Sequence, residues 1–343
     1  MQKRLYLILG NGFSIDLVNR INCKEQIDLT NLFKFGYQVK WLSDEEPGFL
    51  SYKRCPNLWN LGARSNQEGG TKLVEEIITC ANVYSYVKLK NPKRILQEDG
   101  IYIKAYKELV EYLKFLFIHY NDLITDHQLI DAIESWGWKF LFDKIKDVNK
   151  RFEKITIVTY NYDIWLERIF DLLNIEYSYP GIKENSNAIV DIIKPHGSIS
   201  FQSDRCLDNS SFEIHYGRDI LEGRLNEIKV ECKNLRVNSR INAMIPPAGD
   251  SARFSSHWSK ELQVIAREAA KKLIEKDEVL LCGLSYWNVD RLELDELFLD
   301  LDAGVNLKVI NPNLPSEFNA VLESLFSNYV VYANSDILGG LYE

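Results

Sequence analysis

The sequence contains no apolar stretch long enough to span a bilayer and no close pair of cysteines. A membrane helix needs about 18 consecutive apolar residues, and the apolar start at residues 5–9 is also too short for a signal peptide. The six cysteines stand far apart, and no Cys-x-x-Cys spacing could form half of a zinc site. We therefore expect a soluble, cytoplasmic protein with free thiols and no membrane contact.

The chain also lacks an excess of basic residues. Its 41 Lys and Arg residues are outnumbered by 49 Asp and Glu residues, which gives a formal net charge of −8. Binding to nucleic acid depends on clustered positive charge, so we expect nucleic acid to matter only indirectly, through a partner. The 343 residues, 46% of them hydrophobic, are typical of a globular protein of two domains, or of one α/β domain with a large insertion.

Short apolar runs that end in Gly, Asn, His or Ser predict buried parallel strands. Such runs are typical of strands that are covered on both faces, and between them apolar residues recur at helical spacing. The sequence therefore predicts an α/β fold of the Rossmann-like, doubly wound type, with a mostly parallel sheet. The expected strands are 5–9, 155–159, 189–194, 279–282, 305–310 and 329–332.

Residues 20–150 interrupt this alternation and are predicted to be a mostly helical insertion after the first strand. Residues 203–240 are polar and irregular, and we expect a hairpin or lid there. The predicted domains are a nucleotide-binding domain from residues 1–19 and 151–343, and the insertion 20–150. Within the insertion, helical periodicity predicts helices over 74–83, 104–120 and 130–145.

Clusters rich in glycine and polar residues follow the predicted strands. Ligands of doubly wound sheets bind outside the carboxyl ends of the strands, so these clusters are candidates for one site. The candidate residues are Gly10, Asn11, Gly12, Phe13 and Ser14, then Thr159, Asn161 and Asp163, then His196 and Gly197, and finally Gly283, Ser285 and Asn311.

Each cluster has both a functional and a purely structural interpretation. The first glycines could let a phosphate approach a helix N-terminus, or could merely fit a tight turn with Ser14 as the helix cap. Asn161 or Asp163 could bind a ligand, or could cap the following helix. His196 follows a strand, where a general base would lie, but it could also be a hydrogen-bonded turn histidine. Because all the clusters fall at strand ends of one predicted sheet, together they favour a site.

Three of the clusters resemble motifs of the sirtuin-like family, in its divergent bacterial branch. Residues 10–14 are similar to that family's glycine-rich phosphate loop, 159–163 to its Thr-x-Asn-x-Asp motif and 194–198 to its His-Gly motif, in the same order. Asn11 stands where the family usually has alanine, and the four-cysteine zinc module of the protein deacylases is missing. Relatives without that module include antiviral-defence proteins that hydrolyse NAD. The Gly-Asn-Gly-Phe opening is also similar to that of bacterial abortive-infection proteins.

The resemblance implies an NAD glycohydrolase that releases nicotinamide and ADP-ribose, as an effector of antiphage defence by NAD depletion. NAD would be the substrate, and no metal is required. Asn161 would hold the ribose or the attacking water, His196 would be the base, and Asp163 would lie at the nicotinamide pocket. The residues implied to hold the nucleotide are Gly10, Asn11, Gly12, Phe13, Ser14, Thr159, Gly197, Gly283, Ser285 and Asn311.

Unrestrained NAD hydrolysis would be toxic to the host. We therefore expect a homo-oligomer or a partner protein that senses infection to control the activity, with the insertion as a candidate contact surface. Two alternatives stay open. One is a non-catalytic subunit that binds NAD or ADP-ribose, and the other is an ADP-ribosyl transferase on the same scaffold.

Overall fold

The computed structural model describes residues 2–65, 70–91, 93, 100–147, 151–217, 223–246, 257–286 and 291–342. Its main sheet consists of β1 (Lys3–Leu9), β2 (Phe152–Thr159), β3 (Tyr177–Ser178), β4 (Val190–Ile193), β10 (Glu278–Cys282), β11 (Asn306–Ile310) and β12 (Tyr329–Tyr332).

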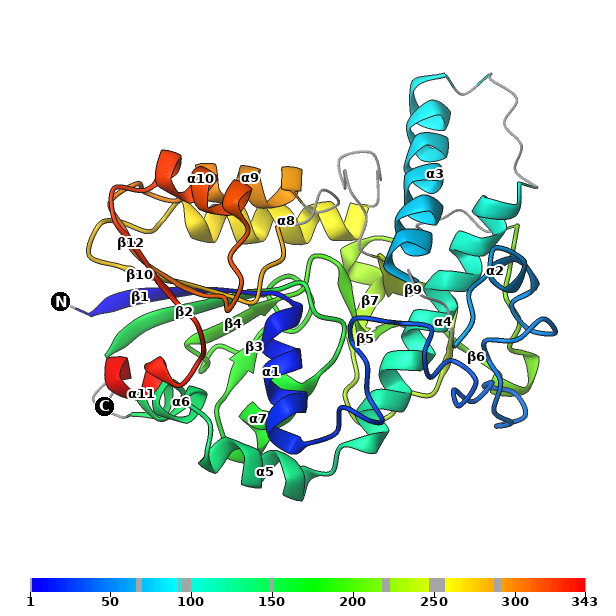
Figure 1. Cartoon of the computed structure of the whole chain (residues 1–343), viewed down its shortest axis with the longest axis horizontal. Helices are drawn as coiled ribbons and strands as arrows, with labels where there is room; N and C mark the ends of the chain where they lie inside the picture. Colours follow the sequence, from blue (N-terminus) through cyan, green and yellow to red (C-terminus); the bar gives the residue numbers. More distant parts are fainter. Residues whose placement is uncertain are drawn as a thin grey trace.

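The main sheet has seven strands in the order β12-β11-β10-β1-β2-β4-β3, and every neighbouring pair is parallel. Helices cover both faces (Figure 1), so the predicted Rossmann-like, doubly wound α/β fold is confirmed. All six predicted strands are present. Only β3 is missed, because two residues are too few to form an apolar pattern.

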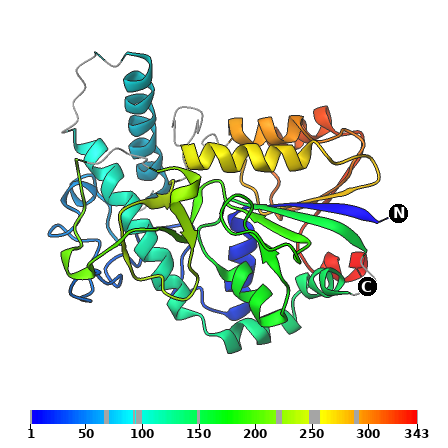
Figure 2. The ribbon, with the colours of Figure 1, turned by 180° about the vertical axis from the view of Figure 1, so that it is seen from behind.

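Two helical layers enclose the sheet, as the views from both sides show (Figures 1 and 2). One layer holds α8 (His257–Ala270), α9 (Arg291–Leu299) and α10 (Ser316–Leu325). The other holds α1 (Asn11–Ile21), α5 (Asp126–Glu134), α6 (Trp138–Lys146), α7 (Trp165–Leu173) and α11 (Ile337–Tyr342).

The stretch 130–145 is helical as predicted, but it is divided between two helices. A capping box at Thr125 begins α5, and α6 starts after Gly137. A Cβ on Gly137 would lie 2.1 Å from the carbonyl oxygen of Ser335, so the chain turns here against the C-terminal segment. Both helices fall within 20–150, yet they pack against α1, α7 and α11 beneath the main sheet.

The rest of the insertion forms a separate lobe. It contains α2 (Pro56–Asn60), α3 (Gly70–Lys90) and α4 (Ile101–Leu123). The long helix α4 packs against α2 and α3, and it also contacts strands β5 (Gly197–Ser203) and β9 (Asn242–Met244). In both views α3 projects away from the body of the protein.

Residues 197–244 contain small antiparallel sheets in the region predicted to be a hairpin or lid. One sheet has the order β7 (Ile228–Val230), β5 (Gly197–Ser203), β9 (Asn242–Met244), and the other pairs β6 (Cys206–Leu207) with β8 (Asn238–Ser239). Among the described helices, none has the length and apolar character of a membrane span.

The strand register aligns the carboxyl ends of the central strands. Leu9 of β1 lies opposite both Thr159 of β2 and Cys282 of β10. On the next strands outward, Cys282 faces Ile310, and β4 ends one residue short of the same level. Segments far apart in the sequence therefore leave the sheet side by side.

Candidate active site

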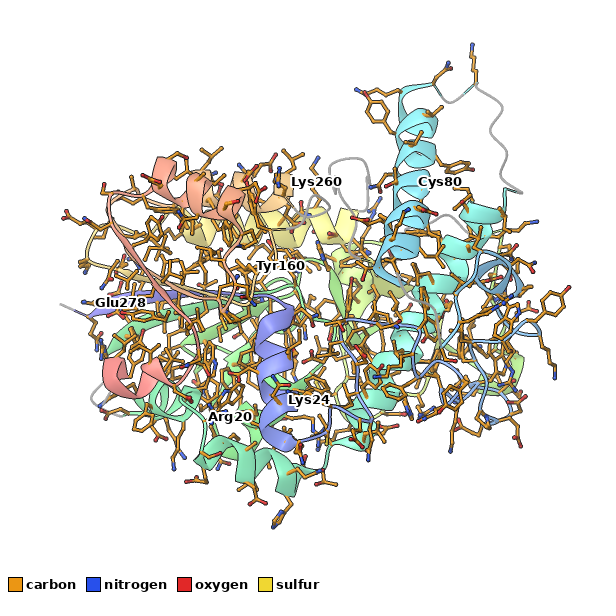
Figure 3. All side chains as sticks on the ribbon, viewed as in Figure 1. Arg20, Lys24, Cys80, Tyr160, Lys260 and Glu278 are labelled. Atoms are coloured by element: carbon orange, nitrogen blue, oxygen red, sulfur yellow. The ribbon has the colours of Figure 1, made fainter. Side chains whose placement is uncertain are left out.

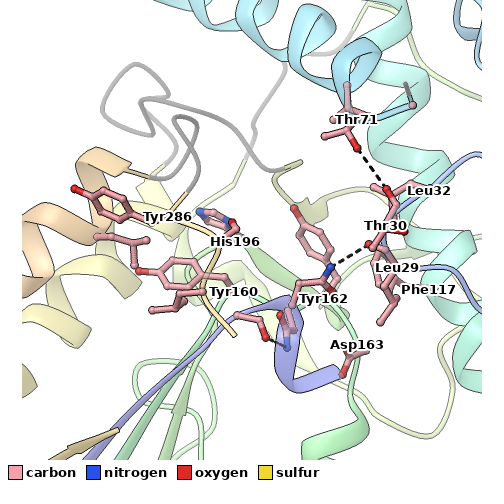
Figure 4. A pocket seen from close by; sticks show the side chains of 18 residues that line it. Leu29, Thr30, Leu32, Thr71, Phe117, Tyr160, Tyr162, Asp163, His196 and Tyr286 are labelled. Atoms are coloured by element: carbon pink, nitrogen blue, oxygen red, sulfur yellow. Dashed lines mark hydrogen bonds between the residues drawn. The ribbon is translucent and has the colours of Figure 1, made fainter. Parts of the chain in front are cut away.

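A cavity of about 340 Å³ lies at the carboxyl ends of β1, β2 and β10. The chain leaves β1 for β2 on one side and later returns to add β10 on the other. Ligands of doubly wound sheets bind at such a switch point. Figure 4 shows the side chains that surround the cavity. The predicted residues that line it are Gly10, Asn11, Asn161, Asp163, His196 and Ser285.

The side-chain amide of Asn161, directly after β2, is fixed by two hydrogen bonds. Its Nδ2 donates to the carbonyl oxygen of Gly10 at 3.0 Å and to Oγ of Ser14 at 2.9 Å. Because the carbonyl oxygen of Gly10 can only accept, the nitrogen and oxygen of the Asn161 amide cannot exchange places. The amide oxygen of Asn161 is therefore the atom that can accept from a ligand. The backbone N–H of Asn161 donates to Oγ1 of Thr159 at 3.2 Å, so Thr159 positions this residue from within the sheet.

Ser14 connects Asn161 to Asp163 from inside α1. Its hydroxyl accepts from Asn161 and donates to Oδ2 of Asp163 at 2.7 Å. The prediction that Ser14 caps the helix is wrong, because Gly10 precedes α1, no side chain caps that end, and Ser14 is fully buried. The other oxygen of Asp163 accepts from the N–H of Trp165 at 3.2 Å, so Asp163 rather than Asn161 binds the start of α7.

A buried ion pair supports Asp163. Nζ of Lys194 lies 2.8 Å from Oε1 of Glu167, with 1% of each side chain exposed, and it also donates to the backbone carbonyl of Asp163. The hydroxyl of Tyr179 donates to the same Glu167 oxygen at 3.1 Å. Burial raises the pKa of Asp163, while the charge of Lys194 and the hydrogen bond from Ser14 oppose that rise. These contacts hold the loop after β2 against the end of β4.

His196 lies in a tight turn between β4 and β5. Its carbonyl oxygen accepts from the N–H of Ile245 at 2.9 Å. The next residue, Gly197, has a φ of +85°, and a Cβ there would lie 1.8 Å from the carbonyl oxygen of Ala243, so only glycine fits. The ring of Tyr160 packs edge-on against the imidazole, with the ring centroids 4.9 Å apart.

The imidazole of His196 is also hydrogen-bonded to Glu293, which the sequence analysis missed. Nε2 of His196 lies 3.0 Å from Oε2 of Glu293, and 3% and 9% of the two side chains are exposed. Glu293 belongs to the first turn of α9, which follows β10 in the chain. It adjoins none of the motifs, so only the position of α9 after a strand-end loop could have pointed to it.

Gly10 and Gly12 pack against Gly283 through the backbone. The N–H of Gly12 donates to the carbonyl oxygen of Gly283 at 3.0 Å. A Cβ on Gly12 would lie 2.4 Å from Cα of Gly283, and one on Gly10 would lie 2.6 Å from the same carbonyl oxygen. The tight-turn interpretation thus accounts for Gly12 and Gly283, whereas Gly10 and Asn11 also line the cavity.

The other predicted residues lie behind the cavity wall. The ring of Phe13 is buried against Trp136 and Trp138, at centroid distances of 5.2 and 5.0 Å. Nδ2 of Asn311 donates to the carbonyl oxygen of Leu284 at 2.9 Å and so supports the loop that carries Ser285. The predicted residues not among the described lining residues are Gly12, Phe13, Ser14, Thr159, Gly197, Gly283 and Asn311.

Residues 20–150 supply an apolar wall that the sequence analysis did not anticipate. Leu29 from the segment after α1, Val74 from α3 and Phe117 from α4 line the cavity. Oγ1 of Thr71 donates to the carbonyl oxygen of Thr30 at 3.4 Å, which joins the start of α3 to that segment. The cavity thus has a polar side on the main sheet and an apolar side on the insertion.

The polar side can orient a hydroxyl-bearing ligand and take up a proton. Asn161 offers an amide oxygen and His196 an imidazole. In the part of the chain that the structure describes, no group of three or more His, Cys, Asp or Glu side chains could hold a metal ion. Comparison of the sequence with models of known protein families finds no match, and comparison with curated proteins finds none either.

Proposed function

We propose that this protein is an NAD glycohydrolase that cleaves the bond between nicotinamide and ribose. One observation carries the proposal: Asn161 and Asp163 from the end of β2 and His196 from the end of β4 meet in one cavity at the switch point of the sheet. Their exposed fractions are 9%, 3% and 2%, so the reacting groups are largely shielded from bulk water. Shielding of this kind favours reaction with a single positioned water.

The chemistry requires a positioned ribose, one water and a base. As the C1′–N bond breaks, its electron pair moves to the nicotinamide ring and leaves an oxocarbenium-like ribose. The oxygen of one water bonds to C1′, and His196 accepts the proton that this water loses. The fixed amide oxygen of Asn161 would accept from a ribose hydroxyl or from the water. Asp163, held by Ser14, would lie nearest the leaving nicotinamide.

The remainder of the nucleotide would extend towards β10. The N–H of Gly12 is already donated to Gly283, and Nδ2 of Asn11 donates to the carbonyl oxygen of Leu29 at 3.0 Å. The hydroxyl of Ser285 and the second N–H of the Asn11 amide would therefore meet the pyrophosphate or ribose from the cavity wall. The N-terminus of α1 would favour the negative charge there. The leaving group would face the apolar wall formed by the insertion.

We further propose that NAD depletion serves bacterial defence, on the strength of the motif resemblance. Because such activity would harm the host, control by a second copy or a partner protein belongs to the same proposal. The projecting helix α3 is the part of the insertion that we propose for that contact, since its Val83 and Tyr86 are 49% and 44% exposed.

The test is release of nicotinamide from NAD by the purified chain. We expect turnover by the wild type, and a loss of at least ~100-fold in kcat for His196→Ala and for Asn161→Ala. The matched controls are His127→Ala, whose side chain is 85% exposed, and Asn328→Ala, which is also exposed. Both should keep wild-type rates.

Calorimetric NAD titration and thermal unfolding of each variant separate catalysis from folding. Wild type that binds NAD without turnover would favour the regulatory-subunit alternative, and transfer of labelled ADP-ribose to an acceptor would favour the transferase. Absence of both binding and turnover would refute the nucleotide site itself.

A further inference from the structure

The contact between His196 and Glu293 has the geometry of a base held by a carboxylate. The atoms that meet are Nε2 and Oε2, at 3.0 Å, and the Glu293 side chain is nine-tenths buried. When the carboxylate is ionised it can only accept, and Nε2 then donates the hydrogen of this contact. In the neutral ring Nδ1 then keeps its lone pair, and that nitrogen is the one able to take a proton.

One helix, α8, holds both residues of this pair in place. At its start, Oγ of Ser259 donates to the carbonyl oxygen of Pro195 at 2.7 Å, in the turn that carries His196. Farther along, Arg267 donates to Glu296 of α9 at 2.6 Å and to Asp300, just after α9, at 2.5 Å. The turn and the helix that carry the pair are therefore anchored to a common rigid element.

The backbone around His196 leaves it little freedom to compensate for a lost partner. Ile245 binds its carbonyl oxygen, and the contact of Gly197 with Ala243 fixes the turn. Only the rotation of the ring about the side-chain bonds stays adjustable, with Tyr160 on one side. The hydrogen bond to Glu293 is one contact that fixes this rotation.

We propose that Glu293 is a positioning residue for His196. It fixes the imidazole with hydrogen on Nε2 and stabilises the positive ring that forms once Nδ1 has accepted the proton from water. The role in turnover rests on the proposed glycohydrolase function, whereas the fixed state of the ring does not.

The state of the ring is tested directly by NMR of protein with ¹⁵N-labelled histidine. In the wild type, at a pH where the His196 ring is neutral, its signals should be those of the form with hydrogen on Nε2. Glu293→Ala should give a mixture of the two neutral forms, whereas Glu293→Gln, whose amide oxygen can still accept, should keep the Nε2–H form. His196 signals unchanged by Glu293→Ala would overturn the proposal.

Kinetics test the consequence for turnover. We expect Glu293→Ala to lower kcat by about 100-fold with little change in KM. Glu293→Gln should recover part of this loss, because it restores the hydrogen bond but not the charge. The control is Glu268→Gln, which removes the same charge from the exposed face of α8, where Glu268 pairs with Lys271.

The two proposals fail separately. If the wild type releases no nicotinamide, the glycohydrolase proposal fails, and the NMR result still decides whether Glu293 sets the state of His196. If the wild type is active and Glu293→Ala keeps full kcat, the positioning role is refuted and the proposed function stands. An equal loss in both Glu293 variants, with lowered thermal stability, would indicate a purely structural residue and would also refute it.

Discussion

Gly12 and Gly283 lie so close that neither has room for a side chain. The two turns that carry them follow β1 and β10, and a hydrogen bond from the N–H of Gly12 joins them. Gly283 also has a φ of +64°, which disfavours any other residue. The glycine-rich motif therefore has a packing role that is separate from any contact with a phosphate.

We predict that Gly12→Ala destabilises the protein although Gly12 lies within helix α1. Alanine is favoured over glycine in a helix by up to ~1 kcal/mol, but the new Cβ would lie 2.4 Å from Cα of Gly283. Backbone atoms cannot yield as a flexible side chain can, so we expect a net loss of about 2 kcal/mol or more in the free energy of unfolding. Urea denaturation measures this change.

The control for Gly12→Ala is Gly340→Ala, in helix α11. No heavy atom lies within 4 Å of a Cβ at Gly340. The same substitution should therefore leave stability unchanged or raise it by up to ~1 kcal/mol. Equal effects of the two substitutions would contradict the packing role of Gly12.

At the scale of the elements, a cluster of charged side chains surrounds Glu278. This residue lies at the amino end of β10, whereas the cavity lies at the carboxyl ends of the strands. Figure 3 places Glu278 towards the end of the molecule and Tyr160 near its centre. The Glu278 carboxylate lies 3.1 Å from Nζ of Lys308, 3.2 Å from Arg151 and 3.4 Å from Lys3. Burial opposes its ionisation, but the charges and hydrogen bonds of Lys308 and Arg151 outweigh this effect and lower the pKa of Glu278 to about 2.

This cluster predicts acid sensitivity. Because the pKa of Glu278 is lower in the folded state than its ordinary value of 4.5, the ionised form stabilises the fold above pH 4.5. That contribution, on the order of 2 to 3 kcal/mol, should be lost as the pH falls from 4.5 towards 2. Urea denaturation across this range measures it.

Glu278→Gln should be destabilised at pH 7, since it leaves the largely buried Lys308 without its counter-charge. Its stability should also fall less steeply than that of the wild type below pH 4.5. Glu275→Gln, at an exposed position just before β10, serves as the control and should follow the wild-type curve. A Glu278→Gln curve parallel to the wild type would show that Glu278 does not carry the acid sensitivity.

At the scale of the whole molecule, the cavity lies between the main sheet and the insertion. The base of α3 supplies Gly70, Thr71 and Val74 to the wall, while the far end of this helix projects into solvent. A contact at the exposed end could therefore be transmitted along one helix to the cavity.

We predict that Thr71→Trp weakens NAD binding by at least ~10-fold without lowering thermal stability. Thr71 is exposed yet lines the cavity, so a larger side chain would fill ligand space without disturbing the core. Calorimetric titration of NAD, with His196→Ala present to prevent turnover, measures the affinity. The adjacent Lys72→Trp is the control, because Lys72 is exposed and is not among the described lining residues. Equal affinities would mean that the ligand does not reach the insertion.

Much of the fold could be predicted from the sequence because it depends on local patterns. A continuous apolar run such as 5–9 must be buried on both faces, whichever neighbours it has. Polar clusters at strand ends pointed to the site for the same reason, since parallel strands end at one edge. Six of the predicted residues accordingly line one cavity.

The sequence could not predict contacts between segments that are distant along the chain. Glu293 becomes the partner of His196 only because α8 anchors both the turn after β4 and helix α9. The local sequence around Ser14 is typical of a helix cap. In the folded chain, however, α1 packs against the loop after β2, and the Ser14 hydroxyl binds Asn161 and Asp163.

The sequence by itself thus determined the parallel sheet and the edge at which a ligand would bind. Only the tertiary structure decided which groups complete the site, including the apolar wall from the insertion and the carboxylate of Glu293. The physical reason is the distance along the chain over which each effect acts. Burial and turn preferences depend on a few neighbouring residues, whereas the hydrogen bond between His196 and Glu293, 97 positions apart, forms only once the whole chain has packed.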